Sequence, residues 1–334
     1  MNTNKFLDMY AKYIWPLARL VTRISPRCKR CILSEKCSPL KDGLCAECRA
    51  KAPAQPSEEP EASDELKQRF AQTIRSYVDD KTHHAVLLLS GGKDSAYMLH
   101  RMRSEFPELR ILCVIVNTGF MSPTAISSAQ FAAEKLKTDL LVCNACIDEF
   151  AAVLRKAFLD LDGRGSYGVI DFAEGSLIYQ VGQKVAADMN IPFVLGGMTW
   201  VQLQRIVGKD DFEIVQQDEP NLVFPLAVWR PNEQEIRKTV RSLKLLPPGN
   251  DSPVVSNSSL ILTMSAIDVM NNGYCSFEPE FAQLVREGKT DRKTWLHLLE
   301  LLEFAVRKRF LEKQIKRTLA ELDLSLSDVV KERK

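Results

Sequence analysis

The sequence predicts an α/β fold in which a parallel, doubly wound sheet is preceded by a short cysteine-rich unit and followed by a helical region. Apolar runs of strand length alternate with segments of helical periodicity, an order typical of a parallel sheet covered by helices. Glycine and polar residues follow several of these runs, where the carboxyl ends of parallel strands gather. At 334 residues the chain can contain more than one structural unit.

The predicted strands are short apolar runs of the kind that parallel sheets bury on both faces. They cover residues 85–89, 111–116, 139–143 and 192–196. Helical patterns cover residues 95–105, 124–137, 148–159, 175–189 and 232–244, and a longer helical periodicity extends over 292–320. The pattern weakens after residue 220, so the sheet is least well defined there.

Composition divides the chain into five segments. These are an amphipathic helical lead (1–27), a four-cysteine unit (28–49), a Pro- and Glu-rich linker (50–63), the α/β domain (64–250) and a helical C-terminal region (251–334). The apolar face of the lead consists of Phe6, Tyr13, Leu17, Leu20 and Ile24, and Pro16 interrupts the helix. The sequence favours packing of this face on its own protein, with a partner or a bilayer surface as the alternative.

Charge and cysteine content limit the functional classes. The net charge is +2, but the first fifty residues hold ten Lys or Arg against four Asp or Glu, and the last thirty residues are also basic. Basic ends are either solvated surface or a face for nucleic acid, an acidic partner or a membrane surface.

No run of about eighteen uncharged apolar residues occurs, so we expect no transmembrane segment. Nine cysteines beside the motifs below indicate a reducing compartment, hence a cytoplasmic protein.

The turn after the first predicted strand carries the strongest functional signal. It is made of Ser90, Gly91, Gly92, Lys93, Asp94 and Ser95. Glycines let the backbone approach a ligand closely, and backbone N–H groups, two hydroxyls and a helix N-terminus converge on one point. The turn is therefore expected to bind a polyphosphate. Lys93 offers a mobile positive charge, and Asp94 either holds Mg²⁺ or caps the helix.

Two other strand ends are expected to complete the same crevice. Asn117 follows the second predicted strand, and Gly196 and Gly197 end the fourth. Ligands of open α/β sheets bind beyond the carboxyl ends of the strands. We therefore assign these three residues to the nucleotide site together with the Ser90–Ser95 turn.

Two Cys-x-x-Cys pairs separated by thirteen residues predict a metal-binding knuckle. The four thiols belong to Cys28, Cys31, Cys45 and Cys48. This spacing can supply four thiolates to one tetrahedral Zn²⁺, and a unit this short needs a metal to fold. Gly43 stands where a tight turn is needed, and Cys37 is expected to be a spare thiol. An iron–sulfur cluster or a redox dithiol are the alternatives to zinc.

A second cysteine group follows the third predicted strand. Cys143 and Cys146 form another Cys-x-x-Cys pair, and Cys275 lies far downstream. The favoured interpretation is that they are partly buried structural residues. The alternatives are three ligands of a [4Fe–4S] cluster with one open iron, or a catalytic thiol pair that carries sulfur.

The Ser-Gly-Gly-x-Asp-Ser form of the Ser90–Ser95 turn resembles the PP-loop of the ATP pyrophosphatases. That resemblance implies a Rossmann-like sheet, ATP with Mg²⁺, cleavage of ATP to AMP and pyrophosphate, and adenylation of an acceptor. The cysteine knuckle, opened by Arg27–Cys31, and the segment 190–197 are similar to the N-acetyl sugar amidotransferase branch, as are 253–258 and 284–292. This branch implies amidation of a sugar or sugar nucleotide with ammonia from a glutaminase partner. Arg286 and Arg292 would then meet substrate, or serve as helix caps and surface ion pairs.

Other hypotheses stay open at this point. PP-loop enzymes that thiolate tRNA also carry cysteine knuckles, and Cys143 and Cys146 fit them better than they fit the amidotransferases. Residues 198–200 (Met-Thr-Trp) depart from both groups and put the acceptor in doubt. A non-catalytic scaffold is the third hypothesis. The oligomeric state is open, a homodimer being one possibility.

Overall fold

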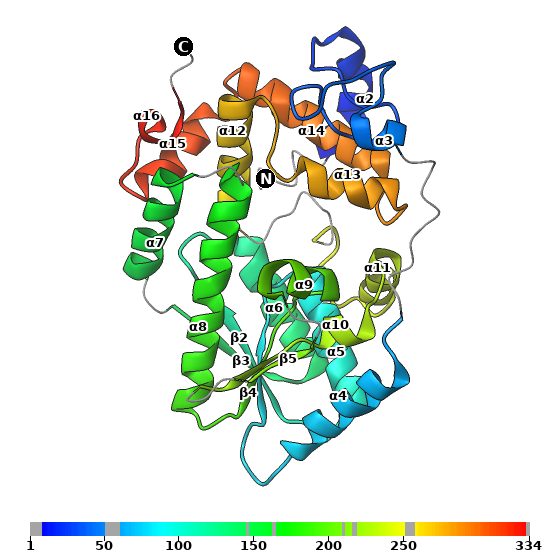
Figure 1. The fold of residues 1–334 in the computed structure, drawn as a ribbon. Coiled ribbons are helices and arrows are strands. Elements are labelled where there is room, and N and C mark those ends of the chain that lie inside the picture. The colour runs from blue at the N-terminus through cyan, green and yellow to red at the C-terminus, as the bar shows by residue number, and fades with distance from the viewer. Residues whose placement is uncertain are drawn as a thin grey trace. The chain divides into compact units, whose positions relative to one another are not determined.

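The computed structural model describes residues 9–50, 61–144, 147–161, 165–208, 211–215, 219–250 and 258–331. The chain forms two compact units, whose elements are labelled in Figure 1. The sheet unit comprises residues 58–147 and 176–251, and the helical unit comprises residues 1–57, 148–175 and 252–334. Residues 148–175, which the sequence-based division places in the α/β domain, group instead with the two ends of the chain.

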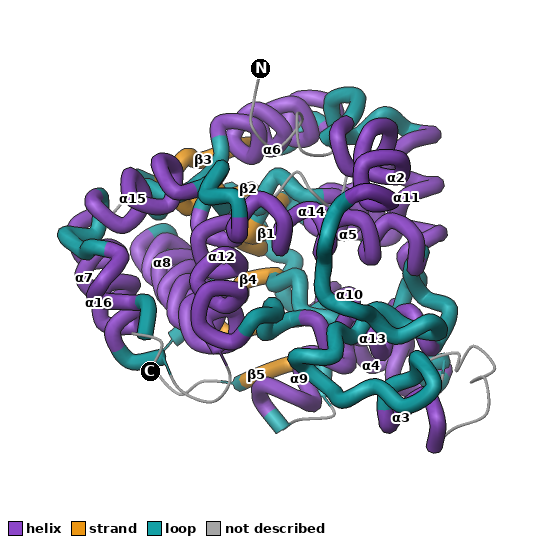
Figure 2. Tube along the Cα trace, turned by 90° about the horizontal axis from the view of Figure 1, so that it is seen from above, coloured by secondary structure: helices purple, strands orange, loops and turns teal. Residues whose placement is uncertain are grey.

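The sheet unit contains a six-stranded sheet in the order β3-β2-β1-β4-β6-β5, and Figure 2 shows β3, β2, β1 and β4 in this sequence. The strands are β1 (Ala85–Leu88), β2 (Ile111–Val116), β3 (Asp139–Cys143), β4 (Phe193–Leu195), β5 (Glu213–Ile214) and β6 (Asn221–Val223). All neighbours pair in parallel except β5 and β6. The predicted fold class is confirmed. The two unpredicted strands, β5 and β6, are too short to give a periodic signal.

Helices pack on both faces of this sheet, as a doubly wound fold requires. One face packs against α4 (Asp64–Ser76), α5 (Lys93–Glu105), α6 (Pro123–Leu136), α10 (Pro225–Trp229) and α11 (Glu233–Ser242). Leu87 points into this layer. Its neighbour Leu88 points to the opposite face, where it closely approaches Gly182 of α8 (Phe172–Asp188). Alternate residues of β1 thus bury on alternate faces. The short helix α9 (Trp200–Val207) follows β4.

The helical unit begins with a π-helical turn η1 (Tyr10–Ile14), α2 (Trp15–Ala18), a 3₁₀ turn η2 (Arg19–Val21) and α3 (Ala46–Ala50). Its remaining elements are α7 (Ile147–Leu159), η3 (Tyr167–Asp171), α12 (Leu260–Asn272), α13 (Glu278–Arg286), α14 (Arg292–Arg307), α15 (Glu312–Ala320) and α16 (Leu326–Val329). The single long periodicity predicted over 292–320 is two helices, because Arg309 adopts a left-handed φ of 58° and ends the first. No described helix combines the length and apolarity that crossing a membrane requires.

Buried ion pairs join the N-terminal segment to the C-terminal helices. The side chain of Arg27 is 4% exposed and lies 3.0 Å from Glu278 and 3.5 Å from Glu303. Trp15 is fully buried and donates its indole N–H to Glu300 at 3.0 Å. A buried charge is strongly destabilising once its partner is removed. The segment that leads into the cysteine knuckle therefore depends on α13 and α14.

Candidate functional site

The Ser90–Ser95 turn links β1 directly to α5. Gly91 is buried and has a φ of +75°, and a Cβ placed on it would lie 2.0 Å from the carbonyl oxygen of Ala125 in α6. Only glycine fits a position that combines left-handed backbone with such close packing. Gly92 then caps α5, which begins at Lys93, two residues before the predicted start. The turn thus presents the N-terminus of α5 at the carboxyl edge of the sheet.

The two serine hydroxyls of this turn converge. Their Oγ atoms, of Ser90 and Ser95, lie 3.1 Å apart. The N–H of Gly92 donates to Ser90 Oγ at 3.4 Å, and Ser95 Oγ donates to the carbonyl oxygen of Gly92 at 3.2 Å. Hydroxyls and N–H groups grouped at a helix N-terminus form a concave donor surface that suits phosphate oxygens.

Lys93 is held by two carboxylates. Its Nζ lies 2.8 and 2.9 Å from the oxygens of Asp94 and 3.0 Å from Glu233 Oε2. Burial opposes the charged amine, but Asp94 and Glu233 outweigh it and raise the pKa of Lys93 above its ordinary value. The ion pair therefore stabilises the fold at neutral pH and is lost only as pH rises through the raised pKa. A polyphosphate would compete with both carboxylates for this cation.

Glu233 is absent from the residues that the sequence predicts for the site. It is the first residue of α11, directly after the N-cap Asn232, where an acidic residue is ordinary helix chemistry. Its carboxylate also lies 2.7 Å from Nε of Arg237, one turn further along the helix. No local pattern distinguishes it from other acidic first-turn residues, and only the packing of α11 on α5 brings it to Lys93.

The other predicted site residues lie at the same edge of the sheet. β1 pairs with β2 on one side and β4 on the other, so the strand order reverses beside β1. Asn117 follows β2, and its N–H donates to the carbonyl oxygen of Cys143 at 2.8 Å, while its Nδ2 donates to Asn144 at 2.9 Å. Gly196 and Gly197 follow β4. Such a reversal point is where open α/β sheets bind ligands.

The two glycines after β4 have different surroundings. A Cβ on Gly196 would lie 2.7 Å from the ring of Tyr179 and 2.8 Å from that of Phe224, whereas a Cβ on Gly197 would meet nothing within 4 Å. The N–H of Gly196 donates to the carbonyl oxygen of Val223 at 2.9 Å and continues the pairing with β6. Gly196 is therefore required by packing, whereas the Cβ position of Gly197 borders open space.

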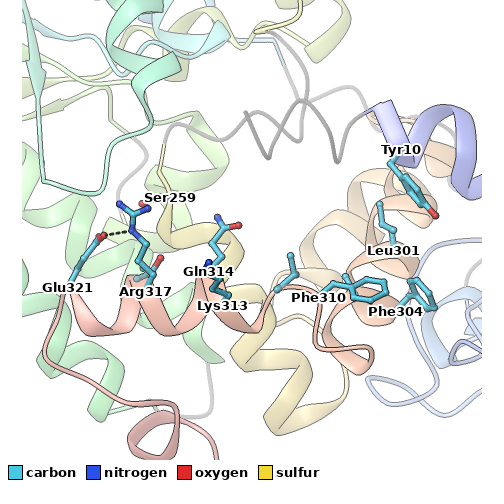
Figure 3. A pocket seen from close by; sticks show the side chains of 12 residues that line it. Tyr10, Ser259, Leu301, Phe304, Phe310, Lys313, Gln314, Arg317 and Glu321 are labelled. Atoms are coloured by element: carbon cyan, nitrogen blue, oxygen red, sulfur yellow. Dashed lines mark ion pairs between the residues drawn. The ribbon is translucent and has the colours of Figure 1, made fainter. Parts of the chain in front are cut away.

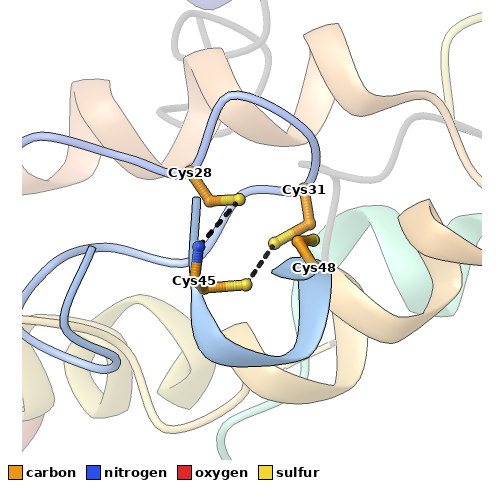
Figure 4. Close-up of side chains that lie close together, drawn as sticks. All are labelled: Cys28, Cys31, Cys45 and Cys48. Carbon is orange, nitrogen blue, oxygen red and sulfur yellow. Dashed lines mark hydrogen bonds between the residues drawn. The ribbon is translucent and has the colours of Figure 1, made fainter. Parts of the chain in front are cut away.

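The four predicted metal-ligating cysteines come together in the helical unit. Their ligand atoms all lie within 4.8 Å of one another, and Cys31 Sγ and Cys45 Sγ are 3.6 Å apart. Figure 4 shows the four side chains directed toward one centre. Sulfurs bound to one zinc ion at about 2.3 Å lie about 3.8 Å from each other. The donor set therefore fits a tetrahedral metal ion.

A tight turn and backbone N–H donors position the thiols of the four-cysteine site. Asp42 and Gly43 both have positive φ, 55° and 80°, as the two central residues of a tight hairpin turn before Cys45. The N–H of Cys45 donates to Cys28 Sγ at 3.4 Å. Burial opposes the thiolate, but backbone N–H donors, chiefly those of Cys31 and Cys45, lower the pKa of Cys28 to about 6. A thiolate is the form that binds metal.

Arg292 supports the knuckle from α14. Its Nε donates to the carbonyl oxygen of Cys31 at 2.7 Å, and its Nη2 donates to that of Cys28 at 2.9 Å. The resemblance suggested substrate contact, a cap or a surface ion pair for this residue. In the structure its two hydrogen bonds fix the backbone that carries Cys28 and Cys31. For Arg286, the buried Nη1 has no hydrogen-bond partner among the described residues.

The remaining cysteines differ in accessibility. Cys37 lies outside the four-thiol group, and burial, followed by the charge of Glu278, raises its pKa to about 12. Cys143 is half-buried at the carboxyl end of β3. Cys275 is 1% exposed, donates to the carbonyl oxygen of Ser265 at 3.7 Å, and belongs to the other unit. Cys146 and residues 253–257, which the sequence singled out, lie outside the described residues, as do 1–8 and 51–60.

Comparison by sequence finds little similarity to known proteins. No protein-family model matches the chain. The uncharacterized protein MJ1599 of Methanocaldococcus jannaschii is 36% identical over 62 residues, which are 19% of this chain and 22% of that protein. The match thus spans about a fifth of the length of this curated relative, and that relative carries no assigned function.

Comparison by structure finds distant likenesses that cover most of the chain. The U34-tRNA thiolase NcsA from Methanococcus maripaludis, solved with its [4Fe-4S] cluster, has a TM-score of 0.39 and 15% identity, with 88% of this chain and 89% of that chain covered. The NH3-dependent NAD synthetase from Campylobacter jejuni has a TM-score of 0.36 and 16% identity, with 75% and 95% covered. The NAD+ synthetase from Burkholderia pseudomallei has a TM-score of 0.37 and 19% identity, with 79% and 93% covered. Likenesses with TM-scores below 0.5 carry no conclusion about the activity of this chain.

Proposed function

We propose that this protein is an adenylating enzyme of the PP-loop ATP pyrophosphatase type, which cleaves ATP to AMP and pyrophosphate. The observation that carries the proposal is the Ser90–Ser95 bend. It joins a buried positive-φ glycine, two converging hydroxyls, a helix N-terminus and Lys93 at the point where the strand order reverses. The six-residue match to the PP-loop motif supports the same assignment.

The chemistry follows from which phosphates the bend holds. Ser90, the N–H of Gly92 and Lys93 bind the two terminal phosphates, and the half-exposed carboxylate of Asp94 would hold Mg²⁺, which neutralises phosphate charge. The α-phosphorus stays open to attack by an acceptor oxygen. A P–O bond to that oxygen forms, and the bond to pyrophosphate breaks. Catalysis then comes from positioning and charge stabilisation.

The acceptor in this proposal is a sugar or sugar nucleotide that carries a carbonyl oxygen. Ammonia from a glutaminase partner attacks the adenylated carbon, and the former carbonyl oxygen leaves with AMP. The cysteine knuckle opened by Arg27–Cys31 and the segment 190–197 support this branch through their similarity to the N-acetyl sugar amidotransferases. The knuckle would hold Zn²⁺ in a structural role.

Thiolation of tRNA is the second candidate function, and the position of Cys143 favours it. Cys143 ends β3 at the same edge of the sheet as Asn117, so its thiol belongs to the unit that carries the phosphate-binding bend. Sulfur insertion would use the same adenylation step, with a sulfur donor in place of ammonia. An iron–sulfur cluster ligated by Cys143 would belong to this candidate function, whereas Cys275 is 1% exposed and lies in the helical unit.

Product analysis tests the proposed reaction. The protein is incubated with α-labelled ATP and Mg²⁺, either with N-acetylated sugar nucleotides and ammonium chloride or with bulk tRNA and sulfide. Release of AMP and pyrophosphate supports adenylation, and the arm that stimulates it identifies the acceptor. Formation of ADP and phosphate would contradict the proposal.

Lys93→Ala is expected to lower the rate of AMP formation about 100-fold or more, because the variant loses the cation that stabilises charge on the departing pyrophosphate. The rate is measured at saturating ATP. Lys135→Ala, which removes an exposed lysine of α6 in the same unit, is the matched control and should retain activity. Equal rates for the two variants would remove Lys93 from the mechanism.

Glu233→Gln is expected to tighten ATP binding about fivefold in the absence of Mg²⁺. The carboxylate 3.0 Å from Lys93 competes with the triphosphate and repels it, an effect of about 1 kcal/mol. Calorimetric titration with ATP measures the change. Glu235→Gln is the control on the same helix, since Glu235 bonds Tyr97 instead of Lys93. Weaker binding by Glu233→Gln would mean that Glu233 assists nucleotide binding.

A further inference from the structure

The N-terminal helical turns of the helical unit carry an apolar ridge that faces solvent. The ridge consists of Tyr13, Leu17, Leu20 and Val21, whose exposed fractions are 66%, 73%, 75% and 90%. The opposite side of the same turns is buried, where Trp15 and Ala11 pack with Leu301, and the Trp15 ring lies tilted against that of Phe304. The sequence favoured packing of the apolar face on the protein itself. Ile24 of that face does pack against the buried cluster, but Tyr13, Leu17 and Leu20 are exposed, and Phe6 lies outside the described residues.

The exposure of these side chains indicates that the ridge is a binding surface. Single exposed apolar residues are common, whereas large apolar side chains that recur every three or four residues on one side of a helical segment mark an interaction site. The segment is anchored, because Arg19 forms two hydrogen bonds to Glu300 at 2.6 and 2.7 Å. The ridge is therefore presented on a fixed scaffold.

Cations predominate on the surface around the ridge, although Arg19 is paired with the buried Glu300. Residues 9–25 contain Lys12, Arg19 and Arg23 and no Asp or Glu. Arg307 Nη1, at the end of α14, donates to the carbonyl oxygen of Arg23 at 3.5 Å, which brings residues 307–309 beside the end of the segment. Within this stretch Arg307 pairs with Glu303 at 2.7 Å and Arg309 with Glu312 at 3.8 Å, while all three side chains stay exposed. We call residues 307–309, Arg-Lys-Arg, the basic corner.

An aromatic cavity adjoins the basic corner. Phe310 is 71% exposed and packs edge-on to Phe304, and both line a cavity of about 850 Å³ together with Tyr10 (Figure 3). Lys313 and Arg317 also line this cavity. Apolar and aromatic side chains thus stand next to cations at this cavity, where Arg317 pairs with Glu321 at 3.4 Å.

We propose that the apolar ridge and the basic corner dock the helical unit on the surface of an anionic lipid bilayer. Aliphatic side chains enter the acyl boundary, and cations meet lipid phosphates, the combination that binds interfacial helices to membranes. A second copy of the chain would bring the same positive charge to the contact and be repelled. Nucleic acid offers no apolar layer for Leu17, Leu20 and Val21. The proposal is independent of the proposed reaction, since the phosphate-binding bend belongs to the sheet unit.

Vesicle co-sedimentation of the full chain tests the proposal. Wild-type protein is expected to sediment with vesicles of phosphatidylcholine plus phosphatidylglycerol and to stay in solution with phosphatidylcholine alone. The double variant Leu17→Gln/Leu20→Gln should bind at least about tenfold more weakly. Leu159→Gln, which changes a 56% exposed leucine elsewhere in the helical unit, is the matched control and should bind as wild type. Lys308→Glu/Arg309→Glu should bind the anionic vesicles at least about tenfold more weakly.

Failure of wild type to sediment with anionic vesicles would overturn the proposal. Equal loss of binding in Leu159→Gln would do so as well. Sedimentation velocity distinguishes a further outcome: if wild type is a dimer that the double variant converts to a monomer, the ridge is a contact between copies instead. Circular dichroism melts of each variant establish that these exposed substitutions leave the fold intact.

Discussion

Gly91→Ala is expected to destabilise the sheet unit by about 3–5 kcal/mol and to abolish AMP formation. The left-handed backbone at φ +75° costs an L-residue about 1–2 kcal/mol. The new methyl would also lie 2.0 Å from the carbonyl oxygen of Ala125, so the bend or α6 must move. Urea denaturation measures the stability, and the assay with labelled ATP measures the activity.

Gly208→Ala separates the cost of the left-handed backbone from the cost of the contact with Ala125. Gly208 ends α9 in the same unit with a φ of +68°, but nothing lies within 4 Å of the position of its Cβ. This variant should lose only about 1 kcal/mol, the cost of the backbone conformation alone. Equal losses in the two variants would show that the contact with Ala125 relaxes at no cost, and unchanged activity in Gly91→Ala would contradict the phosphate-binding role of the bend.

Cys31→Ser is expected to remove the bound metal and to lower the melting temperature of the helical unit by about 10 °C or more. Structural zinc contributes about 10–16 kcal/mol of apparent binding free energy in short knuckles, and this free energy is folding free energy. The effect should extend beyond the knuckle, because Arg292 of α14 bonds the carbonyl oxygens of Cys28 and Cys31, and Arg27 pairs with α13 and α14.

Elemental analysis and thermal melts of the full chain measure this effect, with Cys37→Ser as the matched control. Cys37 lies outside the four-thiol group, so its variant should keep about one equivalent of metal and melt like wild type. Visible absorption distinguishes a colourless zinc site from an iron–sulfur cluster. A metal-free wild type, or one that melts unchanged after chelation, would contradict the metal site.

Most strands of the sheet could be predicted from the sequence. The apolar runs at 85–89, 111–116, 139–143 and 192–196 predict β1 to β4 to within one residue, because parallel strands leave a strong local signal of consecutive apolar residues. β1, β2 and β4 are buried throughout, whereas the edge strand β3 is partly exposed. The positions of Asn117 and Gly196 then follow from topology alone. β5 and β6, of two and three residues, leave no such signal and are held in place by the sheet itself.

In the helical unit, the contacts between distant residues could not be predicted from the sequence. Nothing in the sequence around Arg292 indicates that its side chain bonds the carbonyl oxygens of Cys28 and Cys31. These residues lie 264 and 261 positions earlier in the chain. The amphipathic lead is similar. Its periodicity is visible in the sequence, but the buried Leu301 and the partly buried Phe304 decide which side faces solvent.

The sequence by itself determined the features whose causes lie within a few neighbouring residues. These are the glycine bend after β1, the Asp42–Gly43 turn of the knuckle, the spacing of its thiols and the alternation of strands and helices. Tertiary structure alone decided that Glu233 pairs with Lys93, that residues 148–175 join the helical unit, and that the N-terminal ridge stays exposed. The reason is physical: turn conformations and thiol spacing are local properties, whereas ion pairs and buried faces depend on which distant helix provides the partner.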